Sequence, residues 1–369
     1  MSKLQSILTT GIFVLLIGGG LLLNIIIPSP DVLESERRRP APFPPLSVDT
    51  VRSSEFMHSF GDFATDHFVF RDTFRTIRAV TVFDIFQQTD KSGIYRDPLI
   101  GAGSFNSVNE RSTERVADRL NRLAEFFPEL DLYYSFVPDK SIYAGRFFPG
   151  FDPDVTRRIL TERLPDMTFI DLTPALAAGD FYRTDLHWDQ AELKAVLSTL
   201  GSAMGFSDRP DRDFSVHTAG EFQGVYAGQI ALPQPPDTMY YLTNYVIESA
   251  KVSYFDPQQG EWVDGPMYDV DAVHGRDPYD LFLKGVQPLI RIENPAADTD
   301  RQLYMFRDSF GSSLAPLLTP AYAVITLIDM RYIDSRVLEH FITFSQENAD
   351  VLFLYSSQVL NNADILLIN

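Results

Sequence analysis

The sequence predicts an α/β fold with a parallel five-stranded sheet and helices on both faces of that sheet. Short aromatic and β-branched runs alternate with segments of helical periodicity, which is the pattern of strands joined by crossover helices. The chain has 369 residues, of which 45% are hydrophobic, so it has enough apolar material for a large core. A long uncharged segment at the N-terminus predicts one further helix outside this fold.

The N-terminal segment has the composition of a membrane span. No charged residue occurs from Leu4 to Pro30. At a rise of roughly 1.5 Å per residue, Ile7 to Ile27 is long enough to cross the bilayer core as a helix. The apolar run ends in Asn24, three isoleucines and Pro28, not in a small-residue cleavage site. We therefore predict that residues 1–30 are an uncleaved anchor, with a removable signal segment as the alternative.

A proline-rich stretch follows the predicted anchor. RRRPAPFPP contains four prolines, which favour an extended and semi-rigid chain, so we interpret residues 31–52 as a stalk. The next stretch is rich in phenylalanine at helical spacing and predicts a mostly helical segment from Ser53 to Phe86. Within it Asp66, His67 and Arg71 lie about one helical turn apart, which favours a capping or ion-pair role.

Residues 53–369 are predicted to form the main domain. The five expected parallel strands are Leu132–Val137, Thr168–Ile170, Leu303–Phe306, Val324–Leu327 and Val351–Tyr355. The expected helices include one that ends before Pro128, one from Asp189 to Met204 and one from Ser335 to Phe344. Residues from about 205 to 300 have little helical periodicity and are rich in Gly, Pro, Tyr and Asp. They predict an insertion of strands and long loops beside the core.

Composition excludes several classes of function. The formal net charge of −19 would repel a nucleic-acid backbone, so we expect no nucleic-acid partner. The chain has no cysteine, which rules out disulfides, thiol nucleophiles and thiolate metal sites. The six histidines show no spacing typical of paired metal ligands. We expect neither a metal ion nor a cofactor.

Two motifs carry residues suited to nucleophilic chemistry. In FRDSFG, Ser309 follows a predicted strand and precedes a glycine, a position that presents a hydroxyl at the carboxyl edge of a sheet. In RTDLHWDQ, Asp185 and His187 are separated by one residue, so the carboxylate can orient one imidazole nitrogen while the other faces a nucleophile. The alternatives are ordinary ones: a turn or capping serine, and a capping aspartate beside a structural histidine.

Several segments together resemble a known family. TDLHW, SFVPDKSIYA, DPYDLFLKG and YMFRDSFGSSLAPLL followed by TLIDMRYID are similar to the DHHW family and, more distantly, to the alginate O-acetylation proteins, both of SGNH-hydrolase-like type. The resemblance implies that Ser309 is the nucleophile, His187 the base and Asp185 the acid of a triad. It also implies a circularly permuted SGNH-like (flavodoxin-like) sheet, because the Asp/His pair precedes the serine along the chain.

Other residues are candidates for binding substrate or an oxyanion. Lys140 and Arg307 at strand ends are suited to substrate oxygens or, equally, to ion pairs. Tyr143 and Trp188 are further candidates for substrate binding, with a core anchor as the alternative for Trp188. The backbone N–H of Ser309 is one expected oxyanion donor. SGNH hydrolases carry an asparagine after the third strand, whereas this chain has YSSQVLNN, so the second donor would come from Ser356, Ser357 or Gln358.

These observations predict an acyltransferase or acetylesterase that acts on a cell-envelope carbohydrate. The resemblance implies an acyl donor, a carbohydrate acceptor and a membrane-bound O-acyltransferase partner. Lys3 precedes the span and Arg37, Arg38 and Arg39 follow it, a distribution that by itself favours a cytoplasmic domain. The acidic residues beside the arginines and the resemblance favour the periplasmic or extracellular side, which we expect. A non-catalytic polysaccharide-binding or scaffold module is the rival hypothesis.

Overall fold

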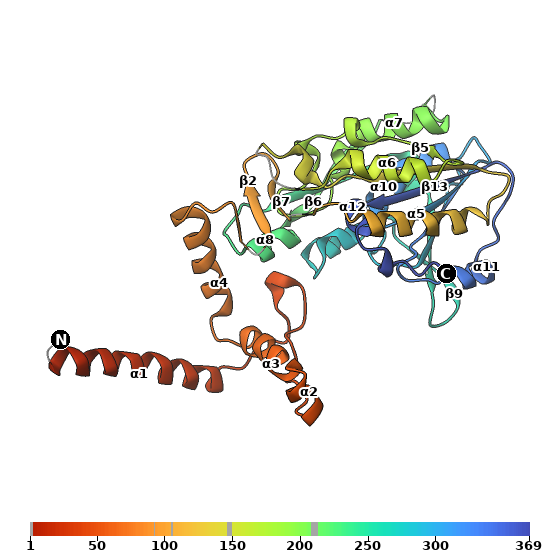
Figure 1. Cartoon of the computed structure of the whole chain (residues 1–369). Helices are drawn as coiled ribbons and strands as arrows, with labels where there is room; N and C mark the ends of the chain where they lie inside the picture. The colour runs from red at the N-terminus through yellow and green to blue at the C-terminus, as the bar shows by residue number, and fades with distance from the viewer. Residues whose placement is uncertain (1–2, 92, 105, 146–149, 208–212) are drawn as a thin grey trace. The chain divides into compact units, whose positions relative to one another are not determined.

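The computed structural model describes residues 3–91, 93–104, 106–145, 150–207 and 213–369. The chain forms two compact units (Figure 1). The N-terminal unit comprises Met1–Lys91 with Ala227–Gln234, and the sheet unit comprises Ser92–Tyr226 with Pro235–Asn369. Residues 53–91, which we expected within the main domain, therefore group with the N-terminal helix.

The N-terminal unit consists mainly of helices. They are α1 (Lys3–Ile26), α2 (Val48–Arg52), α3 (Glu55–Asp66), α4 (Arg71–Val80) and the π-helical turn η2 (Thr81–Ile85). Among the described residues, α1 is the one helix that is long and apolar enough to cross a membrane, with a mean hydropathy of 2.2, and none of its side chains is buried. The mostly helical character predicted for residues 53–86 is confirmed.

The proline-rich stretch is partly as expected. Residues 40–47 contain no helix or strand, but the end of the expected stalk forms the short helix α2. Ser47 caps this helix, because its hydroxyl accepts from the backbone N of Thr50 and the Thr50 hydroxyl accepts from the backbone N of Ser47. The predicted ion-pair role of Asp66 is confirmed, since its two carboxylate oxygens accept from Arg38 at 2.5 and 2.7 Å.

An eight-stranded mixed sheet is the centre of the sheet unit. Its strand order is β5-β4-β13-β11-β12-β10-β8-β9. The first five of these strands pair in parallel and correspond to the five predicted strands: β5 (Thr168–Phe169), β4 (Asp131–Val137), β13 (Ala349–Ser356), β11 (Gln302–Arg307) and β12 (Val324–Ile328). Because these strands are parallel, their carboxyl ends all lie at one edge of the sheet.

Three strands from the expected insertion extend this sheet. They are β10 (Leu289–Glu293), β8 (Lys251–Asp256) and β9 (Glu261–Gly265), and each pairs antiparallel with its neighbours. The rest of the insertion contains the hairpin of β6 (Ser215–Phe222) and β7 (Asp237–Thr243), with α8 (Val225–Ile230) between the two strands and α9 (Tyr245–Ser249) after them. A second hairpin joins β2 (Ile94–Asp97) to β3 (Gly101–Ser104). The sheet is therefore larger and more mixed than the five parallel strands predicted.

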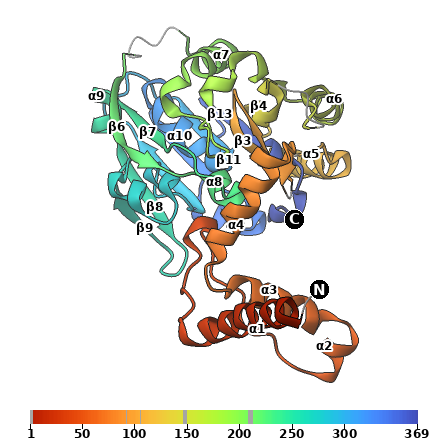
Figure 2. The ribbon, with the colours of Figure 1, turned by 90° about the vertical axis from the view of Figure 1, so that its left-hand side faces the viewer.

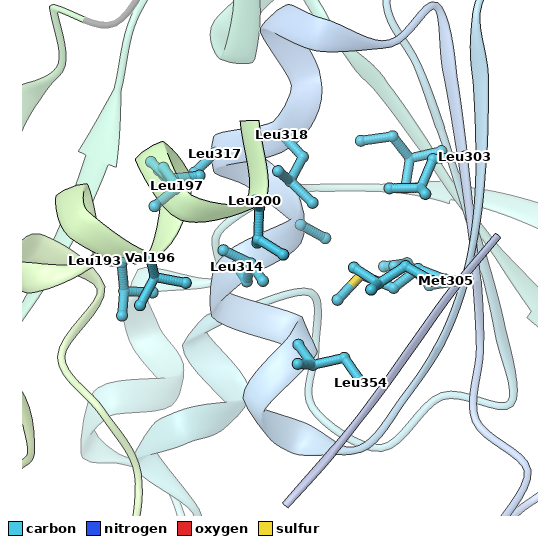
Figure 3. Packing of buried hydrophobic residues seen from close by; sticks show 14 of the residues in the cluster. Leu193, Val196, Leu197, Leu200, Leu303, Met305, Leu314, Leu317, Leu318 and Leu354 are labelled. Atoms are coloured by element: carbon cyan, nitrogen blue, oxygen red, sulfur yellow. The ribbon is translucent and has the colours of Figure 1, made fainter. Parts of the chain in front are cut away.

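Helices cover both faces of the sheet, as predicted. Side chains alternate along β11, so Leu303 and Met305 join one core while Tyr304 and Phe306 join the other. The first core contains the apolar faces of α7 (Lys194–Met204) and α10 (Ser309–Leu318), and in Figure 3 α10 lies between α7 and the strand that carries Leu303 and Met305. The second contains those of α5 (Glu110–Ala124) and α6 (Pro153–Arg163), which lie side by side (Figure 2).

The helix predicted from Ser335 to Phe344 is wrong in its extent. The structure has a 3-10 turn, η10 (Ser335–Val337), then α11 (Leu338–Phe341), and the chain becomes extended at Ile342. The extended segment carries the ring of Phe344 to 4.7 Å from that of Phe127, in an edge-to-face contact. Packing of this aromatic pair thus replaces the last helical turn that periodicity alone predicted.

Candidate active site

Ser309 is the first residue of α10 and lies just beyond the end of β11. Asp308, not Ser309, is the N-cap of this helix. Its Oδ1 accepts from the backbone N of Phe310 at 3.0 Å, and its Oδ2 accepts from the backbone N of Ser356 at 2.7 Å. Since Asp308 supplies the cap, the hydroxyl of Ser309 is not needed for it and is available for another partner.

Asp185 and His187 lie in a tight loop between the 3-10 turns η5 (Ala178–Asp180) and η6 (Gln190–Glu192). A β-bridge between Phe181 and Trp188 closes this loop. Asp185 Oδ1 lies 2.7 Å from His187 Nδ1 and also accepts from the backbone N of His187 at 3.1 Å. The other carboxylate oxygen, Oδ2, accepts from the backbone N of Val225 at 2.9 Å. Hydrogen bonds thus hold both oxygens of the carboxylate in place.

The imidazole of His187 joins the two motifs. Its Nε2 lies 2.7 Å from Ser309 Oγ, although the two residues are 122 positions apart in the chain. Asp185 and His187 are buried and Ser309 is partly exposed. Because a carboxylate can only accept, Nδ1 carries the proton of this pair, and Nε2 is then free to accept from the serine hydroxyl. The predicted hydrogen-bond contact of His187 with both partners is confirmed.

This arrangement is suited to proton transfer from a hydroxyl to an imidazole. Removal of the Oγ proton by Nε2 would leave a nucleophilic oxygen at the start of a helix, and the buried carboxylate would stabilise the resulting imidazolium. The partial exposure of Ser309 leaves its oxygen accessible from solvent. A partly exposed hydroxyl beside a buried imidazole is the geometry that reaction with a small electrophile needs.

Tyr279 is a site residue that the sequence reasoning missed. It lies on the 3-10 turn η8 (Pro278–Leu281), and its ring stacks on the His187 imidazole with the centroids 3.8 Å apart and the planes within 9° of parallel. Its hydroxyl donates to Ser313 Oγ at 2.7 Å. Burial raises the pKa of this hydroxyl, so it stays protonated. Tyr279 lies in the DPYDLFLKG segment, which contributed to the family resemblance. The resemblance assigned no role to this tyrosine.

We expect the Tyr279 ring to hold the imidazole in line with the serine. Tyr279→Leu removes the stacked ring, which is worth about 1 kcal/mol, and should lower kcat roughly fivefold with little change in KM. Tyr279→Phe keeps the ring and should stay within about threefold of the parent. Steady-state kinetics on an acetyl ester measures both, and the exposed Tyr245→Leu on α9 is the matched control. Equal losses in the Leu and Phe variants would contradict a role for the ring.

Trp188 and Lys140 do not face a substrate. The Trp188 side chain is fully buried and donates from Nε1 to Ser313 Oγ at 2.8 Å, so the structure supports the core anchor and not substrate binding. Lys140 is also buried, and its ammonium donates to the carbonyls of Asp185 at 2.7 Å, Tyr182 at 2.9 Å and Ile100 at 3.1 Å. Burial lowers the pKa of Lys140 to about 8. The three N–H groups of the Lys140 ammonium are bonded inside the protein. The lysine therefore stabilises the loop that carries Asp185.

Arg307 is the second cation that is bonded inside the protein. Its side chain is buried, and its Nη1 lies 3.5 Å from Asp329 Oδ2 and donates to the carbonyl of Asp308 at 3.3 Å. Burial lowers the pKa of this guanidinium, opposed by the nearby Asp329. The ion-pair alternative therefore describes Arg307. Tyr143 donates from its hydroxyl to the carbonyl of Thr173 at 2.8 Å and stays partly exposed, so its contact with substrate remains a prediction.

The expected oxyanion donors fall into two groups. The backbone N of Ser356 is bonded to Asp308, so Ser356 cannot offer this N–H to an oxyanion. Ser357 is the first residue of α12 (Ser357–Leu360), next to the Asp308 contact, and Gln358 donates to Tyr226 Oη at 3.4 Å. Ser309 begins α10. The backbone N–H groups of Ser309, Ser357 and Gln358 stay the predicted donors, each in the first turn of a helix.

Asp189, two residues after His187, predicts a pH dependence of stability. Its carboxylate accepts from the backbone N of Ala191 at 3.0 Å, and burial raises its pKa from 3.8 to about 6. Between pH 4 and 6 the folded chain therefore binds more protons at this residue than the unfolded chain does, so this residue lowers stability as the pH rises. We expect the difference in free energy of unfolding between Asp189→Asn and the parent to favour the variant more at pH 7 than at pH 4. Urea unfolding at the two pH values measures this difference. An unchanged difference would contradict the raised pKa.

Comparison with known proteins shows a likeness in fold. No family model matches the chain, and no curated protein matches it in sequence. Bacillus cereus PatB1, solved with a sulfonyl adduct, is 17% identical with a TM-score of 0.59 over 75% of this chain and 98% of its own. A DHHW family protein from Eubacterium siraeum is 19% identical with a TM-score of 0.53 over 75% and 92%.

The O-acetyltransferase domain of Pseudomonas putida AlgJ is 12% identical with a TM-score of 0.45 over 74% of this chain and 93% of its own. At these identities the likeness to PatB1 and to the Eubacterium siraeum protein shows the fold alone. The resemblance predicted from the sequence motifs is confirmed at that level: this chain shares the fold of a DHHW family protein and of PatB1.

Proposed function

We propose that the chain is a membrane-anchored serine O-acetyltransferase that modifies a carbohydrate of the cell envelope. The observation that carries this proposal is the hydrogen bonding of His187 to both Asp185 and Ser309 at 2.7 Å. A lone serine at a helix start is more often structural, but a serine that is bonded to a buried and carboxylate-oriented imidazole has a base at hand. The resemblance of the motifs supplies the substrate class.

The proposed reaction passes through an acyl-enzyme. His187 Nε2 takes the proton from Ser309 Oγ, which attacks the carbonyl carbon of the acyl donor and forms a tetrahedral oxyanion. The oxyanion collapses, the donor's leaving group departs with the proton from His187, and the acyl group remains as an ester on Ser309. An acceptor hydroxyl then gives its proton to His187 and attacks this ester, and as the second tetrahedral oxyanion collapses, Ser309 Oγ leaves and takes this proton from His187. Water in place of the carbohydrate would make the same residues an esterase.

The surroundings of the reaction are also part of the proposal. Helix α1 would anchor the chain, with the sheet unit on the periplasmic or extracellular side, where envelope carbohydrates are found. The motif resemblance supports a membrane-bound O-acyltransferase as the partner that delivers acyl groups across the membrane. The arginines after α1 oppose this orientation by the charge rule, and their pairing weakens that objection, because Arg38 is bonded to Glu36 and Asp66.

A sulfonyl fluoride tests the central step. Sulfonyl reagents modify activated hydroxyls, and PatB1 carries such an adduct, so we expect rapid labelling of this chain at Ser309, located by peptide mass spectrometry. Ser309→Ala should remove the label, whereas Ser198→Ala on the exposed face of α7 should keep it. Acetyl transfer is then measured from a small acetyl ester to oligosaccharides. Absence of both labelling and turnover, with oligosaccharide still bound, would favour the non-catalytic module.

A further inference from the structure

Helix α4 exposes its apolar side chains to solvent. Phe70, Phe74, Ile77 and Ile85 follow one another at intervals that keep them on one side of α4 and the π-turn η2, and each is more than half exposed. The opposite side faces the protein. There Ala79 is fully buried. This distribution is the reverse of a helix that faces water, where the apolar stripe is the buried one.

The inward side of α4 is polar and well bonded. Arg75 donates to the carbonyl of Gly228 at 2.7 Å and lies 3.0 Å from Glu36, and Arg71 lies 2.8 Å from Glu36. These contacts fix the rotation of α4 about its axis, so the exposed phenylalanines cannot turn inward without breaking them. The outward apolar side is thus built into the N-terminal unit.

The neighbouring helix α3 shows the same feature. Phe43 packs edge-on against three rings of α3, those of Phe56, Phe60 and Phe63, with centroids 5.3 to 6.4 Å apart, yet Phe43 and Met57 are each more than half exposed. Single exposed apolar residues are common on protein surfaces, but several of them along one helix mark a surface that is covered in use.

A hydrogen bond places this surface at the end of α1. Asn24, in the last turn of α1, accepts at Oδ1 from the backbone N of Val69 at 2.7 Å, and its amide donates to the carbonyl of Gly20 at 3.1 Å. Val69 belongs to the turn between α3 and α4, which also carries Phe68 and Phe70. Helix α1 has 24 residues, about 36 Å of rise, against a hydrocarbon core of about 30 Å. Its last turn therefore lies where a span leaves the hydrocarbon.

The charges beside these rings fit a lipid surface. A groove beside the turn is lined by Phe68, Phe74 and the exposed Arg78, together with Arg71 and Arg75, whose guanidinium groups are paired with Glu36. Aromatic side chains at the headgroup level combined with an exposed guanidinium group are typical of a helix that lies in a membrane interface. A protein partner would not require the turn to be bonded to the end of the span, whereas a bilayer is present at that level whenever α1 spans it.

We propose that the face formed by Phe68, Phe70, Phe74, Ile77 and Ile85, here called the Phe face, lies in the membrane–water interface. The N-terminal unit then contacts the bilayer through two elements: α1 spans it, and α4 lies in its interface. It is therefore attached to the membrane surface and does not extend from it as a stalk. This inference concerns how the chain is attached and does not depend on the chemistry at Ser309.

Site-directed spin labelling tests the Phe face in the full chain. The sequence has no cysteine, so each introduced cysteine carries the single label. The variants are Phe74→Cys and Ile77→Cys on the Phe face, Leu15→Cys within α1 as the bilayer reference and Tyr245→Cys on α9 as the exposed reference in the sheet unit. Each is reconstituted in phosphatidylethanolamine–phosphatidylglycerol vesicles, with circular dichroism as the folding control. Accessibility to oxygen and to a water-soluble nickel complex gives the depth of each label.

We expect the labels at 74 and 77 to be at least threefold less accessible to nickel than the label at 245, while remaining accessible to oxygen. Their depth should lie between the water and the label at 15. Nickel accessibility equal to that at 245, with the label at 15 in the bilayer, would overturn the proposal. Low accessibility to both reagents would overturn it as well, because that result indicates cover by protein, either a partner or the sheet unit, and not by lipid.

Discussion

Replacing Ser309 by alanine should reduce acetyl-ester turnover by a factor of at least about a thousand, because no other atom can take the place of the attacking Oγ. His187→Ala should cost about the same, since Ser309 loses the base 2.7 Å away. Residues that act as one unit are not additive, so the double variant should be hardly worse than either single one. The measurement is kcat/KM on a small acetyl ester.

The control for this prediction is a hydroxyl that is not bonded to His187. Ser198→Ala, on the exposed side of α7, should keep full activity, and circular dichroism should show all variants folded. Asp185→Ala should cost somewhat less than the other two, because the carboxylate orients and does not attack. A folded Ser309→Ala chain with full turnover would refute the proposed mechanism.

Lys140→Met should destabilise the fold by about 2–4 kcal/mol and also lower turnover more than tenfold. Methionine fills a similar space but leaves the carbonyls of Asp185, Tyr182 and Ile100 buried without their donor. The first two of these carbonyls belong to the loop that aligns Asp185 with His187, so this alignment should loosen. Urea unfolding and kcat on the acetyl ester measure the two effects.

An exposed lysine provides the matched control for Lys140. Lys194→Met, at the start of α7, should change the free energy of unfolding by less than about 0.5 kcal/mol. If Lys140 bound substrate, which was one of the two alternatives for a cation at this strand end, its loss would instead raise KM and leave stability unchanged. A raised KM alone would therefore contradict the structural role.

The five parallel strands and the position of Ser309 at a strand end were predictable because their signals are local. A short apolar run identifies a parallel strand, and a polar residue just after it lies at the carboxyl edge of the sheet, so Ser309 could be placed from β11 alone. The family resemblance joined it to the Asp/His loop. The interpretation of the chain order as a circular permutation remains a prediction.

The roles of Lys140 and Arg307 were not predictable in the same way. A cation after a strand gives the same sequence pattern whether it meets water, a substrate or buried carbonyls, and only the contacts distinguish these cases. Tyr279 was missed because stacking on an imidazole leaves no spacing signal between residues 92 positions apart. The strands β8 to β10 were missed as sheet members because their alternation with loops resembled an insertion beside the core.

The hydroxyl of Ser313 determines the angular setting of α10. It accepts from Trp188 at 2.8 Å and from Tyr279 at 2.7 Å and donates to the carbonyl of Phe310 at 3.2 Å, so its one proton and both lone pairs are used. Ser313 lies four positions, about one turn, after Ser309 on the same helix. Rotation of α10 that moved Ser309 away from the imidazole would break both bonds at Ser313. The direction in which Ser309 Oγ faces the His187 imidazole is thus stabilised one turn further along the helix, by Ser313, which has no role in the proposed reaction.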